Sequence, residues 1–229
     1  EHDEVDAAAR IASNIGDMGR FRLRDEAAGW AAEVVDAARR VRHPRLIVLL
    51  TWAASRAWSI GELEQSKHYG EEAISLASNA EMDPFVWAFT DLAMVASYEG
   101  DWNRAIELAR AGANHAADCG DRFCLALLPF YLAAGGHTEE AMMLADQIVA
   151  TAESTGIPSS VSAALWAKGK AFAATDAVTA VAAYERSIAI ACESGNRLWE
   201  ALAAVEVTAL QAGLMDPIGA LTSFRQMMD

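Results

Sequence analysis

Apolar residues recur at helical spacing ahead of a series of short turns in this 229-residue chain. Five turns, spaced 39, 36, 39 and 38 residues apart, are Gly61-Glu62, Gly100-Asp101, Gly136-His137, Thr175-Asp176 and Gly213-Leu214. Three positions ahead of every turn are apolar. Eleven residues before the turns these are Leu50, Phe89, Leu125, Ala164 and Leu202, and eight residues before them Ala53, Leu92, Leu128, Ala167 and Val205. Four residues before the turns they are Ala57, Ala96, Leu132, Ala171 and Ala209. Offsets of three and four residues share one face of an α-helix. The pattern therefore predicts a repeated helix before each turn.

A second apolar-periodic segment follows each turn, and the pairs end in polar links that contain glycine. One such segment consists of Ala105, Ile106, Ala109, Ala113 and Ala116, and the links are residues 118–121, 154–156 and 193–196. A less regular first hairpin places Ala8, Ile11 and Ile15 ahead of Gly19, with a second helix near residues 25–40. Helix pairs that bury a face only against their neighbours stack into a superhelix. We therefore predict an all-α solenoid of about six antiparallel helix hairpins with a period of 36–39 residues, in a single domain over residues 1–229.

Prolines mark particular helix positions. Asp83-Pro84 and Asp216-Pro217 each combine an N-cap residue with proline at the first helical position. Pro129 falls inside a predicted first helix, where it should remove one backbone hydrogen bond and kink the helix.

Composition narrows the class of protein. Alanine, the best helix former, supplies 50 residues. A net charge of −14 argues against a nucleic-acid surface, because phosphate binding requires clustered Lys and Arg. Apolar runs such as residues 46–50 are far shorter than the ~20 residues of a membrane helix. Three cysteines are too few for a disulfide framework and favour a reducing, cytoplasmic compartment. The first residue is glutamate and no cleavable leader follows it, so we expect a fragment of a larger multidomain protein.

One unit, residues 87–117, carries a pattern of small and large residues that resembles a tetratricopeptide repeat (TPR). The pattern consists of Phe89, Leu92, Ala93, Ala96, Gly100-Asp101-Trp102, Ala105-Ile106, Ala109 and Gly112. Other units match more loosely: Lys168 and Glu206 stand in the column of Ala93, and Ser66 and Ile218 stand in the column of Ala105. The period is also longer than the usual ~34 residues.

This longer, alanine-rich variety resembles the helical arm of large bacterial regulators, namely LuxR-type transcription activators and adenylate cyclase–ATPase–repeat proteins of the STAND class. The resemblance implies a non-catalytic arm for protein interaction or ligand sensing that regulates an ATPase elsewhere in the protein. The expected partner is a protein, a peptide or a small inducer. One alternative is a free-standing TPR adaptor that binds its partner constitutively. A second alternative is a structural repeat that associates with copies of itself into a homo-oligomer.

The first helices of stacked hairpins line a concave side, which is the usual binding surface. The predicted partner-binding residues on that side are Thr51, Ser55, Trp58, Trp87, Thr90, Met94, Tyr98, Phe123, Phe130 and Phe172. This set is aromatic and nearly uncharged, which suits an apolar or amphipathic segment in a groove. The alternative is that an alanine-rich solenoid curves tightly, so that these aromatic residues form an inner core.

Positive charge concentrates near the start of the chain, where Arg20, Arg22 and Arg24 crowd one link. They are a candidate docking patch for an acidic domain, with solvated helix-end charge as the alternative.

No catalytic, cofactor or metal motif is recognisable. The chain lacks the G-x-x-x-x-G-K-[ST] pattern of a phosphate-binding loop. Adjacent acids such as Glu139-Glu140 point some 100° apart on a helix and cannot act on one bond together. His115, Cys119, Cys124 and His137 match no familiar zinc spacing. We therefore expect no enzymatic activity, no cofactor, no bound metal, no direct nucleic-acid contact and no membrane contact.

Overall fold

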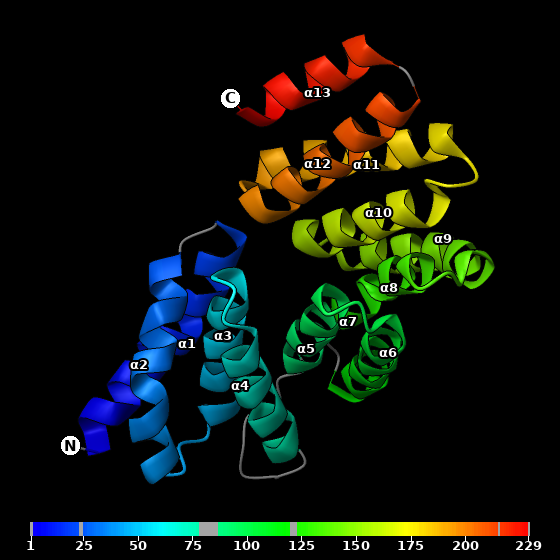
Figure 1. The fold of residues 1–229 in the computed structure, drawn as a ribbon. Coiled ribbons are helices and arrows are strands. Elements are labelled where there is room, and N and C mark those ends of the chain that lie inside the picture. The colour runs from blue at the N-terminus through cyan, green and yellow to red at the C-terminus, as the bar shows by residue number, and fades with distance from the viewer. Residues whose placement is uncertain (1, 23–24, 78–86, 120–122, 215, 229) are drawn as a thin grey trace. The chain divides into compact units, whose positions relative to one another are not determined.

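The structure, a computed structural model, describes residues 2–22, 25–77, 87–119, 123–214 and 216–228, and every regular element within them is an α-helix (Figure 1). The helices are α1 (His2–Phe21), α2 (Asp25–Arg40), α3 (Leu46–Ser59), α4 (Leu63–Leu76), α5 (Trp87–Tyr98), α6 (Trp102–Cys119), α7 (Phe123–Ala126), α8 (Leu128–Ala134), α9 (Thr138–Thr155), α10 (Pro158–Phe172), α11 (Ala177–Ser194), α12 (Arg197–Gly213) and α13 (Pro217–Met228).

These helices pair in chain order: α1 with α2, α3 with α4, α5 with α6, α8 with α9, α10 with α11, and α12 with α13. The six hairpins confirm the predicted all-α solenoid class. The chain divides into two compact units, Glu1–Cys124 (unit 1) and Leu125–Asp229 (unit 2), with the boundary inside α7. A single domain over residues 1–229 stays a prediction.

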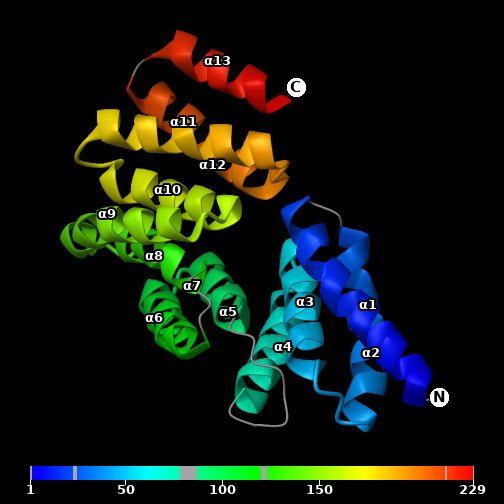
Figure 2. The same cartoon turned by 180° about the vertical axis from the view of Figure 1, so that it is seen from behind.

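Within each unit the first helices of successive hairpins pack directly on one another. In unit 1, α3 contacts both α1 and α5, and in unit 2, α10 contacts both α8 and α12 (Figure 2). The second helices meet through long side chains instead. Arg39 of α2 pairs with Glu72 of α4 at 2.7 Å, and Arg186 of α11 pairs with Glu153 of α9 at 2.6 Å. The first helices are therefore the more closely packed layer of each unit, as expected for an inner layer.

Glycine is required at three of the predicted turns. Gly61, Gly100 and Gly136 have φ angles of 84°, 79° and 89°, which is the left-handed region that side chains disfavour. After each glycine, a backbone N–H donates to a carbonyl five residues earlier: Glu62 to Ala57, Asp101 to Ala96, and His137 to Leu132. This bond closes each first helix and sets the register of the second one.

The predicted fifth turn, at Gly213, is wrong by two residues. The same closing bond runs from Asp216 N–H to Gln211 at 3.0 Å, and α12 continues through Gly213. Two α12 residues that the sequence pattern placed on the apolar face of the helix are consequently exposed, namely Val205 (55%) and Ala209. The residues that α12 buries are Trp199, Ala203, Ala204, Val207 and Gln211.

The proline predictions are confirmed where the structure describes them. The helix that would contain Pro129 is broken into α7 and α8, with Pro129 in the first turn of α8. At Asp216-Pro217 the Asp216 carboxylate accepts the Gly219 N–H at 2.9 Å and caps α13. The Asp83-Pro84 pair lies outside the described residues.

Candidate interaction surface

Four of the ten predicted partner-binding residues are buried in unit 1. Thr51, Ser55, Trp87 and Thr90 are between 0% and 7% exposed. Ser55 Oγ donates a 2.6 Å hydrogen bond to the carboxylate of Asp91, which is 1% exposed and ties α5 to α3. Burial of these side chains favours the inner-core alternative at these four positions.

Trp87 belongs to an aromatic cluster that joins the three first helices of unit 1. Its ring lies 5.6 Å from Phe21 of α1, edge to face, and 5.7 Å from Trp52 of α3. Trp52 is 1% exposed, and its indole N–H donates to the Ser13 carbonyl at 3.1 Å. Burial of large aromatic side chains makes this cluster a main source of packing energy in unit 1.

Three other predicted residues remain accessible at the C-terminal ends of α3 and α5. Trp58 and Tyr98 pack with ring centroids 5.8 Å apart, and Met94 lies one turn before Tyr98 on the same helix face. Tyr98 is 63% exposed, whereas Trp58 and Met94 are half-buried. Among the described residues, the Trp58 indole N–H has no hydrogen-bond partner. We call Trp58, Met94 and Tyr98 the aromatic edge.

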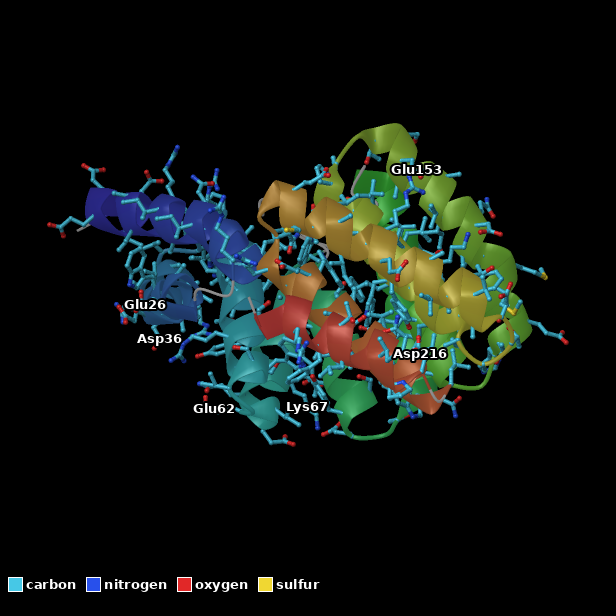
Figure 3. The ribbon with its side chains drawn as sticks, turned by 90° about the horizontal axis from the view of Figure 1, so that it is seen from above. Glu26, Asp36, Glu62, Lys67, Glu153 and Asp216 are labelled. Atoms are coloured by element: carbon cyan, nitrogen blue, oxygen red, sulfur yellow. The ribbon has the colours of Figure 1, made fainter. Side chains whose placement is uncertain are left out.

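An ion-pair network connects α4 to the residue that follows α5. Lys67 of α4, labelled in Figure 3, pairs with Glu99 and, at 3.2 Å, with Glu64. The hydrogen bond to Glu99 is the main reason that the pKa of Lys67 lies above its ordinary value. Because these side chains are partly solvated, we expect the ion pairs to add little to stability.

In unit 2 an aromatic row crosses the three first helices. Phe130 of α8 stacks on Trp166 of α10 at 4.4 Å, and Trp166 lies 5.6 Å from Trp199 of α12. Phe130 is half-buried, whereas Trp166 and Trp199 are each 3% exposed. The row is thus mostly core, with the accessible part of it at Phe130.

Charged residues lie beside this row on the first helices of unit 2. Lys170 of α10 donates to both carboxylate oxygens of Glu206 of α12 at 3.1 Å. Lys168 pairs with Asp146 of α9 at 2.6 Å, and its ammonium lies 5.6 Å from the Phe172 ring. Phe172 is half-buried. The accessible inner residues of unit 2 are therefore part apolar and part charged.

Tyr184 of α11 is fully buried, and its hydroxyl has no hydrogen-bond partner among the described residues. Burial is the main reason that the pKa of Tyr184 is raised far above its ordinary value, and the Glu206 carboxylate raises it further. The folded protein therefore keeps this phenol neutral at a pH where the unfolded chain ionises it.

We expect Tyr184→Phe to leave the free energy of unfolding unchanged at pH 7 or to raise it by about 1 kcal/mol, because the variant removes a buried hydroxyl that makes no bond. Above pH ~10 the unfolded wild-type chain binds fewer protons than the folded one, so stability falls as pH rises. Urea denaturation at pH 7 and at pH ~11 should show a smaller loss for Tyr184→Phe. Tyr98→Phe, at an exposed tyrosine, should lose as much stability as the wild type.

Several predicted residues lie where the structure gives no side chain. Phe123 begins α7, but its side chain is outside the described part, as are those of Arg20 and Arg24. Arg22 is exposed. The docking patch formed by these three arginines therefore stays a prediction.

Among the described residues, no group of three or more His, Cys, Asp or Glu side chains is placed to hold a metal ion. The side chains of Cys119 and Cys124 lie outside the described part. A surface hollow at the start of α9 is lined by Gly136, His137, Thr138, Glu139 and Glu140. Its two carboxylates would repel a phosphate. None of the helices that the structure describes has the length and apolarity needed to cross a bilayer.

The fold is similar to solved repeat proteins at low sequence identity. BtubC (BKLC) from P. vanneervenii matches with a TM-score of 0.62 and 17% identity, over 88% of this chain and 88% of that one. A Podosopora anserina protein assigned as a kinesin light chain, with nearly identical TPR-like repeats, matches with a TM-score of 0.54 and 17% identity. A variant of that protein with one substituted residue matches with a TM-score of 0.57 and 18% identity. Each of these two Podosopora anserina matches covers 82% of this chain and 97% of the matched chain.

No protein-family model and no curated protein matches the sequence. The structural matches establish a TPR-like helical repeat fold. Solenoids of this kind present an extended concave surface that can serve for binding.

Proposed function

We propose that the chain is a non-catalytic interaction arm that binds a segment of a partner protein on the layer of first helices. The observation that carries this proposal is the aromatic edge. Tyr98 is largely exposed on that layer, while Trp58 and Met94 beside it are only half-buried. Tyrosine and tryptophan are the side chains most often responsible for binding energy at protein interfaces.

The chemistry of the aromatic edge favours an apolar or amphipathic segment. An aromatic pair and a methionine offer a large apolar contact area with few fixed hydrogen bonds. The Trp58 indole N–H adds a donor that a backbone carbonyl of the segment would satisfy if the ring turned toward it. A small inducer with an apolar body and one acceptor would fit the same description.

We further propose that this arm belongs to a larger cytoplasmic bacterial regulator, in keeping with its resemblance to the arms of LuxR-type and STAND-class proteins. In such a protein the ligand must bind one state of the arm better than another to transmit a signal. The Arg20, Arg22 and Arg24 cluster would then dock a neighbouring acidic domain. The alternative is an adaptor that binds its partner constitutively. Sequencing the gene beyond both ends of this chain distinguishes the regulator from the adaptor. A phosphate-binding loop encoded upstream and a helix-turn-helix encoded downstream would support the regulator.

Peptide selection tests the binding role. A random displayed peptide library is selected on the immobilised chain, and the best peptide is labelled and titrated by fluorescence anisotropy. We expect Tyr98→Ala to raise its Kd at least ~10-fold, which corresponds to about 1.4 kcal/mol.

The matched control is Met143→Ala, at a residue of α9 that is 79% exposed and belongs to a second helix. It should leave the Kd unchanged. A selection that yields no binding peptide, or peptides that bind Tyr98→Ala as tightly as the wild type, would contradict the assignment of this surface.

A further inference from the structure

The last helix of the chain has an apolar outward side. Ile218, Leu221 and Phe224 of α13 are 79%, 49% and 46% exposed, and they follow one another at three-residue intervals. The opposite side of α13 faces α12, where Ser223 Oγ donates to the Gln211 side chain at 2.7 Å. Three large apolar side chains on the solvent side of one short helix are unusual, because water normally meets polar residues there.

Comparison of equivalent positions in the repeats shows that part of this surface corresponds to residues that are buried in the earlier hairpins. Phe224 stands eight residues after Asp216, and the matching residues of the four preceding second helices are all buried: Gly70, Ala109, Ala145 and Tyr184. Val205 of α12 is 55% exposed, whereas the matching residues of the preceding first helices, Thr51, Thr90, Ala126 and Leu165, are all buried. Phe224 and Val205 of the α12–α13 face thus lie on the surface that stacking buries inside the solenoid, whereas Ile218 extends the stripe beyond it, because the matching residues Glu64, Asn103, Glu139 and Val178 are exposed.

We propose that this face binds a second copy of the chain, with the two α13 helices antiparallel about a two-fold axis near Leu221. The stripe is self-complementary in sequence, because Ile218 and Phe224 are each three residues from Leu221. Antiparallel pairing sets Ile218 of one copy opposite Phe224 of the other. A two-fold interface uses the same surface on both copies, so such symmetry is what it requires.

Charge at the two ends of α13 fits the same arrangement. Asp216, labelled at the start of α13 in Figure 3, lies five residues before Leu221, and Arg225 lies four residues after it. With a rise of ~1.5 Å per residue, antiparallel pairing brings Arg225 of one copy to within about 2 Å of the level of Asp216 of the other. Arg225 is exposed and makes no ion pair within the described residues. Opposite charges would therefore lie at the same level of the two paired helices and attract each other, although the Asp216 carboxylate, which caps α13, lies on the side of the helix away from the stripe.

Sedimentation velocity on the 229-residue chain over a range of concentrations tests the proposal. We expect a species of twice the 24.5 kDa chain mass to form as concentration rises. Leu221→Asp should raise the dissociation constant at least ~100-fold, because it places two carboxylates next to each other on the axis. The matched control is Val178→Asp, at a residue of α11 that is 81% exposed and lies outside the α12–α13 face. It should dimerise as the wild type does.

Cross-linking tests the antiparallel geometry. In a background in which Cys119, Cys124 and Cys192 are all replaced by serine, Leu221→Cys should give a covalent dimer with a short bismaleimide. The same background without Leu221→Cys should give none. A chain that stays monomeric at every concentration overturns the proposal, and so does a dimer that Leu221→Asp leaves intact. A dimer that is sensitive to Leu221→Asp but does not cross-link through Cys at 221 overturns the two-fold pairing of α13.

Discussion

Replacement of Trp52 by alanine is expected to lower the free energy of unfolding of unit 1 by about 3–5 kcal/mol. Trp52 is 1% exposed and packs against Trp87. It lies so close to Gly16 of α1 that a Cβ there would be 2.4 Å from its ring. The variant would leave a cavity between three first helices and would also remove the bond from the indole N–H to the Ser13 carbonyl. Urea denaturation followed by far-ultraviolet circular dichroism measures the change.

Trp30→Ala is the matched control, because Trp30 lies on α2 of the same unit and is 48% exposed. We expect it to cost less than about 1 kcal/mol, since a surface substitution leaves no cavity. Equal losses for the two variants would mean that the packing of the first helices around Trp52 does not dominate the stability of unit 1.

The sequence was sufficient to predict the helical repeat, because its signals are local. Apolar residues at offsets of three and four define a helix face without knowledge of its neighbours. The second helix of the first hairpin was predicted near residues 25–40, and α2 spans Asp25–Arg40. The glycines at three turns adopt the left-handed conformation that a helix-ending glycine commonly supplies.

The register error at the last hairpin arose because two signals competed within a few residues. Gly213 resembles the earlier turn glycines, but the structure ends α12 after it and starts α13 at Pro217. The interaction that decides where α13 begins is the hydrogen bond that the Gly219 N–H donates to the Asp216 carboxylate, which caps the helix. The Asp216-Pro217 pair was recognised as a helix start from the sequence, so giving the cap precedence over the glycine would have placed the turn correctly.

The inner-layer side chains were harder to assign, because their exposure depends on how closely neighbouring first helices pack. Thr51 and Tyr98 were placed on the same predicted surface, yet one is 0% and the other 63% exposed. The Ser55–Asp91 bond was not predicted. Its partners are 36 residues apart, as are Lys170 and Glu206. A search for complementary polar residues one repeat apart would have found both contacts between first helices.

Gly169→Ala is expected to destabilise unit 2 by about 1–3 kcal/mol, although alanine is the better helix former. A Cβ on Gly169 of α10 would lie 2.4 Å from Cε1 of Tyr184 and 2.6 Å from two further ring atoms. Tyr184 is fully buried, so its ring cannot move without displacing its neighbours. Thermal unfolding of the variant should therefore occur at a lower temperature than that of the wild type.

Gly213→Ala separates this steric effect from helix propensity. Gly213 ends α12, its φ lies outside the left-handed region, and a Cβ there would meet nothing within 4 Å. The substitution should therefore raise the free energy of unfolding by up to about 1 kcal/mol by restricting the unfolded chain. If both variants were stabilising, α10 and α11 would have to be farther apart than the Gly169–Tyr184 contact requires. Opposite signs would mean that the closeness of these two helices depends on the absence of a side chain at residue 169.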